Sequence, residues 1–172
     1  MKSYIVLFRG INVGGKNIVP MKELKSLLEG HGYDYVKTYI QSGNLVVKTM
    51  VNPSDHIGLL VLSKFGFNPE IMAIDKSKFN ALVASNPFQS FEGKTVHFYF
   101  CAKKPSLNKT KLNSVIASSE AYELKGKVFY LHAPDGIGRS KLVSNIESCL
   151  GVAATGRNLN TVSKLYEIVN TE

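Results

Sequence analysis

Short apolar runs, separated by polar segments that contain glycine and asparagine, divide the chain into alternating strand and helix patterns. In the first half, the runs typical of strands are Tyr4–Phe8, Tyr35–Ile40, Leu45–Lys48 and Pro69–Ile74. Two helices are predicted between them, one from Pro20 with Met21, Leu24, Leu27 and Leu28 on one face, and one after Asn52-Pro53 with Ile57, Leu60, Val61 and Phe65 on one face. The first half therefore predicts the order β-α-β-β-α-β.

The same order of patterns recurs in the second half. After a short helix that carries Phe79, Leu82 and Val83, strands are predicted at Thr95–Cys101, Ala121–Leu124, Val128–His132 and Val152–Thr155. Helices are predicted within Leu107–Ile116, over a stretch with Leu142, Val143, Ile146, Cys149 and Leu150 that Gly151 closes, and in a tail with Val162, Leu165 and Val169.

These two series predict an α+β fold of two tandem ferredoxin-like (split βαβ) units with antiparallel sheets and a C-terminal helix. Hairpins inside each series exclude a sheet in which all strands are parallel. We expect the first unit at residues 1–75, a connecting helix and linker at 76–94, and the second unit with the tail helix at 95–172. The residues themselves do not repeat, so this is a repeat of element order.

Composition narrows the class of protein. Of the 172 residues, 44% are hydrophobic and 20% are charged, and no apolar run approaches the roughly 20 residues that a membrane span needs. Two cysteines, Cys101 and Cys149, argue against a disulfide scaffold and fit a reducing compartment. We therefore expect a soluble, cytoplasmic protein without membrane contact.

The chain is basic, with a formal net charge of +8. The stretch with Lys103, Lys104, Lys109 and Lys111 contains no acidic residue. Such an excess favours phosphate-bearing partners, although a solubilising surface would show the same excess.

The segment Arg9–Asn17 contains the densest group of candidate binding residues. Gly10 and Gly15-Lys16 have the spacing of a phosphate-binding loop, but Asn17 stands where the magnesium-binding Ser or Thr would be, which excludes a nucleotide-hydrolysing loop of that type. An anion could still contact the glycine backbone together with Arg9 and Lys16. The alternative is that the glycines only provide turn geometry.

Three further segments carry candidate residues that turn or cap geometry would also explain. They are the hairpin turn around Ser42-Gly43-Asn44, the loop Asp135–Lys141, and the run Ala154–Thr161 that precedes the tail helix. The three arginines of the chain lie in polar loop segments, Arg9 in the segment Arg9–Asn17 and Arg139 and Arg157 in the last two of these three, and Arg suits planar recognition of anions. The candidate ligand-binding residues are Arg9, Asn12, Gly14, Gly15, Lys16, Ser42, Asn44, Arg139, Ser140, Arg157 and Asn158.

No catalytic or metal-binding motif stands out. The histidines His31, His56, His97 and His132 lack metal-ligand spacing to one another or to the cysteines, so no metal and no cofactor is expected. His97 has the position of a sheet residue. The segment Lys125–Phe129 partly matches an RNA-recognition strand, although packing is the commoner role of such an aromatic residue.

Together these segments resemble a known family. FRGINVGGKN at 8–17, TYIQSGN at 38–44, PDGIGRSKL at 134–142 and ATGRNLNTVSKL at 154–165 resemble the bacterial family called domain of unknown function 1697. The resemblance implies an α+β fold of two related units in a cytosolic protein, and it implies no reaction. Two positions depart from the family pattern, Leu159 where Trp is frequent and Val47 where an aromatic residue is frequent. If that Trp stacks on a ligand in the family, Leu159 affects binding here; if it packs in the core, Leu is a tolerable replacement.

We therefore expect a protein that binds an anionic, phosphate-containing ligand through its Gly/Arg/Asn-rich loops. One alternative is binding of RNA or single-stranded nucleic acid through basic sheet faces and the Lys103–Lys111 stretch. The other is a hydrolase or transferase whose site, with Ser42, Ser140 and a histidine, assembles only in space. Whether the chain is an enzyme, and its oligomeric state, stay open at this stage.

Overall fold

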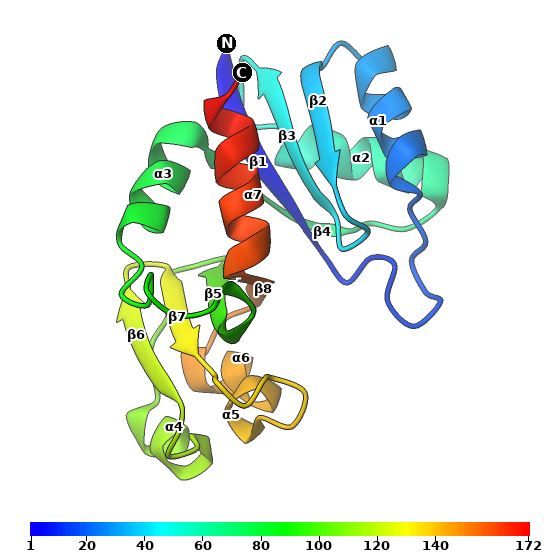
Figure 1. Cartoon of the computed structure of the whole chain (residues 1–172). Coiled ribbons are helices and arrows are strands. Elements are labelled where there is room, and N and C mark those ends of the chain that lie inside the picture. The colour runs from blue at the N-terminus through cyan, green and yellow to red at the C-terminus, as the bar shows by residue number, and fades with distance from the viewer. The chain divides into compact units, whose positions relative to one another are not determined.

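The computed structural model describes residues 1–172 and contains two four-stranded antiparallel sheets with helices (Figure 1). The chain divides into two compact units, one of Met1–Val83 with Lys164–Glu172 and one of Ala84–Ser163. The expected mixed α+β class with a C-terminal helix is confirmed. None of the helices is both long and apolar enough to cross a membrane.

The first unit contains the sheet with strand order β2-β3-β1-β4. Its strands are β1 (Lys2–Arg9), β2 (Asp34–Tyr39), β3 (Asn44–Thr49) and β4 (Glu70–Asp75), each within two residues of a predicted strand at either end. Every neighbouring pair is antiparallel. The central strand β1 is buried from Ser3 to Phe8, which explains why its sequence is almost continuously apolar.

Helices α1 (Met21–Gly30) and α2 (Ser54–Phe65) pack on one face of this sheet and α3 (Lys76–Ala84) follows β4. The predicted apolar faces form the core, in which Leu24, Leu28, Ile57 and Val61 contact the β1 side chains. Pro20 was expected at the first helical position and instead stands one residue earlier, as the N-cap of α1. Pro20 has extended backbone angles there, and its carbonyl accepts the Leu24 N–H.

The last part of the tail helix α7 (Leu159–Asn170) belongs to the first unit and lies on the sheet face opposite α1 and α2 (Figure 1). The Tyr35 hydroxyl donates to the Ile168 carbonyl at 3.3 Å, and Ser3 Oγ donates to the Glu172 carboxylate at 2.5 Å. Val162, Leu165 and Val169 are fully buried, so the predicted apolar face of the tail helix is confirmed.

The second unit contains the sheet with strand order β6-β7-β5-β8. Its strands are β5 (Val96–Cys101), β6 (Ala121–Lys125), β7 (Val128–His132) and β8 (Ala154–Asn158). The predicted last strand, Val152–Thr155, starts two residues before the observed strand and ends three residues before its end. Strand β8 continues through polar residues because Arg157 and Asn158 pair with Phe98 and His97 of β5, and backbone pairing does not require apolar side chains.

Strand β5 is buried at all six positions, including His97 and Tyr99. Its alternation of apolar and polar side chains is the pattern of a half-exposed strand, so burial of both faces was not evident from the sequence. A short turn of 3-10 helix, η1 (Gly93–Thr95), leads into the strand.

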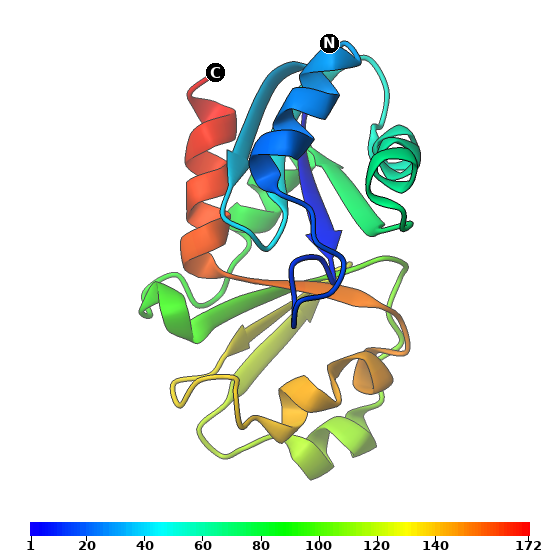
Figure 2. The same ribbon diagram turned by 90° about the vertical axis from the view of Figure 1, so that its right-hand side faces the viewer.

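Helices α4 (Lys109–Val115), α5 (Lys141–Ser144) and α6 (Ile146–Leu150) cover one face of the second sheet (Figure 2). A single helix was predicted over Leu142–Leu150, and this was wrong because the helix breaks at Asn145. Asn145 has φ −115° and ψ 11°, and its side-chain amide donates to the Lys141 carbonyl at 2.7 Å. The predicted end at Gly151 is confirmed, since this residue has the left-handed φ of 74°.

Candidate functional site

The glycine-containing segment after β1 is a narrow hairpin. The Lys16 N–H donates to the Val13 carbonyl at 3.1 Å, and the Asn12 N–H donates to the Asn17 carbonyl at 3.1 Å. Gly14 and Gly15 occupy the two central turn positions with φ of 59° and 74°. A tight hairpin turn of this kind needs positive φ at both positions. Turn geometry therefore accounts for both glycines, and the tip presents Lys16 to solvent.

Asn12 connects this hairpin to the β2–β3 turn. Its side-chain amide donates to the carbonyls of Val19 at 2.9 Å and Gln41 at 2.7 Å, while its Oδ1 accepts the Val19 N–H at 2.8 Å. These bonds use both amide hydrogens and the amide oxygen. Asn12 therefore orders the loop, and its side chain is not available as a ligand-binding donor in this conformation.

The other polar candidates of the first unit are also engaged. Asn44 is fully buried and donates to the Tyr39 carbonyl at 3.1 Å and to Ser42 Oγ at 2.8 Å, which holds the hairpin turn. Arg9 forms an ion pair with Glu70 at 2.6 Å across the β1–β4 edge. The structure thus brings the first-unit candidates onto two joined loops, in which Arg9 and Lys16 supply the positive charge.

In the second unit, Ser140 caps α5 and binds a carboxylate that the sequence did not indicate. Its hydroxyl donates to Glu120 Oε2 at 2.6 Å and accepts the Val143 N–H at 3.2 Å. Glu120 also accepts the Ala117 N–H at 2.8 Å. Burial, together with the nearby Glu120 charge, raises the pKa of Tyr99 to about 12. Ser140 is therefore part of a structural network, whereas the adjacent Arg139 is exposed.

Arg157 lies on β8 and is half-buried. Its Nη1 donates to the Gly156 carbonyl at 2.8 Å, and burial lowers the pKa of its guanidinium to about 10. The next residue, Asn158, caps α7 through an Oδ1 that accepts the Thr161 N–H at 2.9 Å. A partly desolvated guanidinium thus lies next to the residue that caps the positive end of a 12-residue helix.

His97 is a residue that the sequence pattern placed in the sheet without a chemical role. It is 7% exposed, and its Nε2 has no hydrogen-bond partner. Burial lowers the pKa of the imidazole, and a hydrogen bond to the Lys94 backbone opposes this shift. His97 is the register partner of Asn158, so the two side chains are cross-strand neighbours. The only sign of His97 in the sequence was its polar position in the alternating pattern of this strand.

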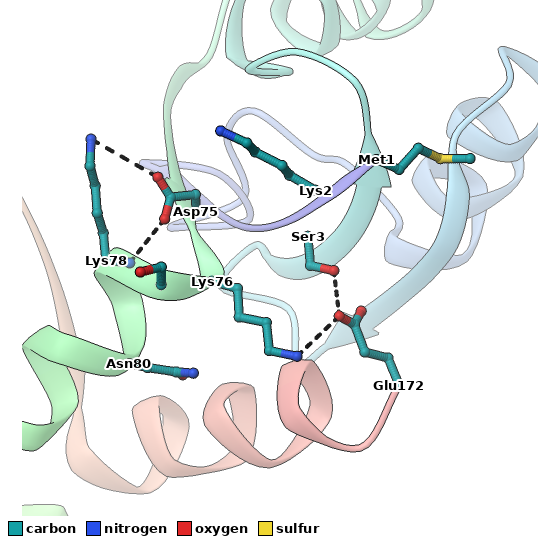
Figure 3. Close-up of a pocket in the computed structure, with 9 residues that line it drawn as sticks. Met1, Lys2, Ser3, Asp75, Lys76, Lys78, Asn80 and Glu172 are labelled. Atoms are coloured by element: carbon teal, nitrogen blue, oxygen red, sulfur yellow. Dashed lines mark hydrogen bonds and ion pairs between the residues drawn. The ribbon is translucent and has the colours of Figure 1, made fainter.

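A lysine-lined pocket in the first unit was also missed, because its residues come from β1, the start of α3 and the end of the chain. Figure 3 shows this pocket of about 820 Å³, with Lys2, Lys76 and Lys78 among its lining residues. Lys76 lies 3.4 Å from Glu172, and Lys78 lies 4.0 Å from Asp75. Two of the three lysines therefore already have a carboxylate partner. The contacts of Glu172 with Lys76 and Ser3 hold the end of the chain against the sheet.

The aromatic residue of the partial RNA-recognition pattern lies in the core. Phe129 is fully buried, and its ring stacks on Tyr122 with a centroid distance of 5.2 Å. This corresponds to the packing role that the sequence also allowed. No group of three or more metal-ligating side chains is present.

Comparison with known proteins defines the family. The chain is similar to a solved structure described as the conserved bacterial protein SP0830 from Streptococcus pneumoniae, at 23% sequence identity and a TM-score of 0.71, over 98% of each chain. At this identity the similarity shows the shared fold. No curated protein matches the chain. The model of one family matches residues 1–130. This match contains the segments at 8–17 and 38–44 and ends before those at 134–142 and 154–165. The chain therefore belongs to the family described as Protein of unknown function (DUF1697), as the sequence resemblance had indicated.

Proposed function

We propose that this protein binds a small phosphate-bearing anion and that the Arg157 guanidinium anchors it. The observation that carries the proposal is the half-buried position of this cation on β8, next to the residue that caps the start of α7. At a site that is partly shielded from water, an approaching anion can form charge-assisted hydrogen bonds that are stronger than those at a fully exposed arginine.

Arg157 also has chemistry suited to this role. Its planar guanidinium can present two parallel N–H groups to a phosphate, which a lysine ammonium cannot do. Its bond to the Gly156 carbonyl restricts the side chain before any ligand arrives. Coulomb attraction is stronger at a half-buried side chain than in bulk water, so a phosphate bound by Arg157 gains more than at a fully exposed arginine.

The remaining candidates have two supporting roles in this proposal. Arg9, Lys16 and Arg139 contribute positive potential that attracts the anion. Asn12, Ser42, Asn44, Ser140 and Asn158 hold the loops and helix ends in place, and Gly14 and Gly15 form the hairpin tip. This proposal assigns the direct contact with the ligand to Arg157, whereas the sequence had suggested that all three arginines take part.

Calorimetric titration at low salt tests the proposal with three probes: inorganic phosphate, AMP and glucose 6-phosphate. We expect at least one probe to bind the wild-type chain, and Arg157→Gln to weaken that binding by about tenfold or more, through loss of a charge-assisted contact. Arg157→Lys should give an intermediate affinity, because the charge stays and the paired N–H groups are lost.

Arg139→Gln is the matched control, since it removes the same charge from an exposed arginine of the same unit. Its affinity should stay within about twofold of wild type, as expected for a screened surface charge. Binding of every probe that is equal in the wild type and in Arg157→Gln would contradict the proposal, and so would the absence of any binding to the wild type.

We further infer that the two units are ferredoxin-like and arose by duplication. The support is that both sheets have the same order when strands are counted within each unit, namely second, third, first, fourth. Each unit also places its helices after its first and third strands, as a split βαβ repeat does.

A further inference from the structure

We propose that His31 and His56 form a binding site for a borderline divalent metal ion such as Zn²⁺ in the first unit. Both imidazoles line one surface pocket of about 180 Å³, together with Tyr33 and Asn52. The pocket lies where α1 ends and α2 begins, so residues distant in the sequence meet there. This proposal is independent of the anion-binding function.

His31 is held with one ring nitrogen ready to bind a metal. It is the C-cap residue of α1, and its Nδ1 lies 2.9 Å from the Leu27 carbonyl oxygen. A carbonyl only accepts hydrogen bonds, so Nδ1 carries the hydrogen and the Nε2 of the neutral ring has a lone pair. A backbone carbonyl on the second nitrogen is a common support for metal-binding histidines.

His56 is oriented in an equivalent way by Tyr33. Its Nδ1 lies 2.7 Å from the Tyr33 hydroxyl oxygen, and the two rings stack with centroids 5.6 Å apart. A tyrosine hydroxyl can either donate or accept a hydrogen bond. When it accepts from Nδ1, the Nε2 of His56 also has a lone pair for a metal ion.

The two imidazoles are close enough to share an ion after a small movement. Their ring centroids are 6.4 Å apart with an interplanar angle of 70°. With Zn–N bonds of about 2.0–2.1 Å in tetrahedral geometry, the centroids of two ligating rings lie about 5 Å apart. Both histidines are exposed, so the two rings can approach each other without movement of the hydrophobic core.

The donor set indicates which ions fit. Imidazole nitrogen suits Zn²⁺, Ni²⁺ and Cu²⁺, while Mg²⁺ and Ca²⁺ prefer oxygen ligands that this pair does not supply. With two protein ligands, the remaining coordination positions are filled by water, so the site is open to a further ligand.

The test combines calorimetry and NMR on the full chain, with Zn²⁺ alone as the probe. We expect one ion per chain, and we expect His31→Gln and His56→Gln each to lower the affinity by about tenfold or more. His132→Gln is the control, since that histidine stacks on Phe91 in the other unit. Tyr33→Phe should weaken binding less than either histidine variant, because both imidazoles stay.

In long-range ¹H–¹⁵N spectra of the imidazole groups, the Nε2 signals of His31 and His56 should shift together during the Zn²⁺ titration. The proposal is overturned if Zn²⁺ does not bind, if only one of the two signals responds, or if both glutamine variants keep wild-type affinity. Thermal unfolding of each variant establishes that it is folded, and the exposed position of both histidines makes folded variants the expected result.

Discussion

Asn12 shows how much of a loop can depend on one side chain. It has a positive φ of 54°, a conformation in which asparagine is enriched, and its amide makes three hydrogen bonds to two segments. The sequence made the same residue a candidate for ligand binding, because binding residues are often found on loops. Its contacts instead assign it to the framework.

Replacing Asn12 with Ala should destabilise the chain by about 1–3 kcal/mol, since three hydrogen bonds are lost and backbone groups are left unpaired. Urea denaturation measures this change, and hydrogen exchange should show faster exchange at the Val19 N–H. Asn12→Asp keeps the acceptor for that N–H and should protect it better than Asn12→Ala. Equal protection in the two variants would contradict the assigned role.

His97 makes stability depend on pH. Its folded-state pKa lies below the ordinary value of 6.5 because the ring is buried. Well above pH 6.5 the imidazole is neutral in both the folded and the unfolded chain, so it does not make the free energy of unfolding depend on pH. As the pH falls below 6.5, the unfolded chain takes up a proton that the folded chain resists, so the free energy of unfolding decreases until the pH reaches the lowered pKa.

His97→Asn should therefore remove part of this acid sensitivity, because an amide retains a donor for the Lys94 backbone and does not titrate. The measurement is the midpoint of urea unfolding between about pH 7.5 and 5 for both proteins. The slope against pH should be smaller in the variant. Parallel slopes would show that other groups cause the acid sensitivity.

Position 156 has no room for a side chain, which explains the glycine there. A Cβ at this position would lie 2.7 Å from the Tyr99 ring, which covers the strand at this point. Gly156→Ala should destabilise the chain by about 1–3 kcal/mol through overpacking. Gly138→Ala is the control, with no heavy atom within 4 Å of the added group, and it should be neutral or slightly stabilising in thermal unfolding. Equal effects of the two variants would refute the spatial explanation.

At the scale of elements, the hydrophobic pattern predicted most helices and strands, because burial of one face sets a period of 3.6 or 2. It did not predict the extension of β8 through Arg157 and Asn158, which depends on pairing with a strand about 60 residues earlier. Nor did it predict the break at Asn145, where side-chain hydrogen bonding competes with the helix. The meeting of His31 and His56 required the fold itself, since neither helix contains both.

Helix caps are a second feature that the sequence indicated in part. It allowed Gly138 or Ser140 as the cap of one helix and Asn158, Asn160 or Thr161 as the cap of the tail helix, and in the structure Ser140 and Asn158 accept the backbone hydrogen bonds. What the sequence could not reveal was the partner of Ser140, because Glu120 lies 20 residues away.

Ser140→Ala should destabilise the second unit by about 2 kcal/mol, since it removes both the α5 cap and the hydrogen bond to the half-buried Glu120. Ser144→Ala, which removes one hydroxyl bonded to a helix carbonyl, should cost less than half as much. Urea denaturation measures the free energy of unfolding of the two variants. A Ser140→Ala chain as stable as Ser144→Ala would contradict the network.

At the scale of the whole molecule, the formal charge of +8 favours anionic partners without defining where they bind. Attraction by net charge alone weakens strongly with salt and does not saturate at one position. A phosphate bound at one site, in contrast, changes the environment of a single guanidinium group, and its binding saturates at a defined stoichiometry. This difference separates a binding site from a basic surface.

The chain contains three arginines, Arg9, Arg139 and Arg157, so their Nε–Hε NMR signals can be followed one by one during a titration with inorganic phosphate, AMP or glucose 6-phosphate. We expect the Arg157 signal to shift saturably with at least one probe while the Arg139 signal stays nearly unchanged. An Arg157 signal that never moves, or three signals that drift together without saturation, would contradict the proposed anion site.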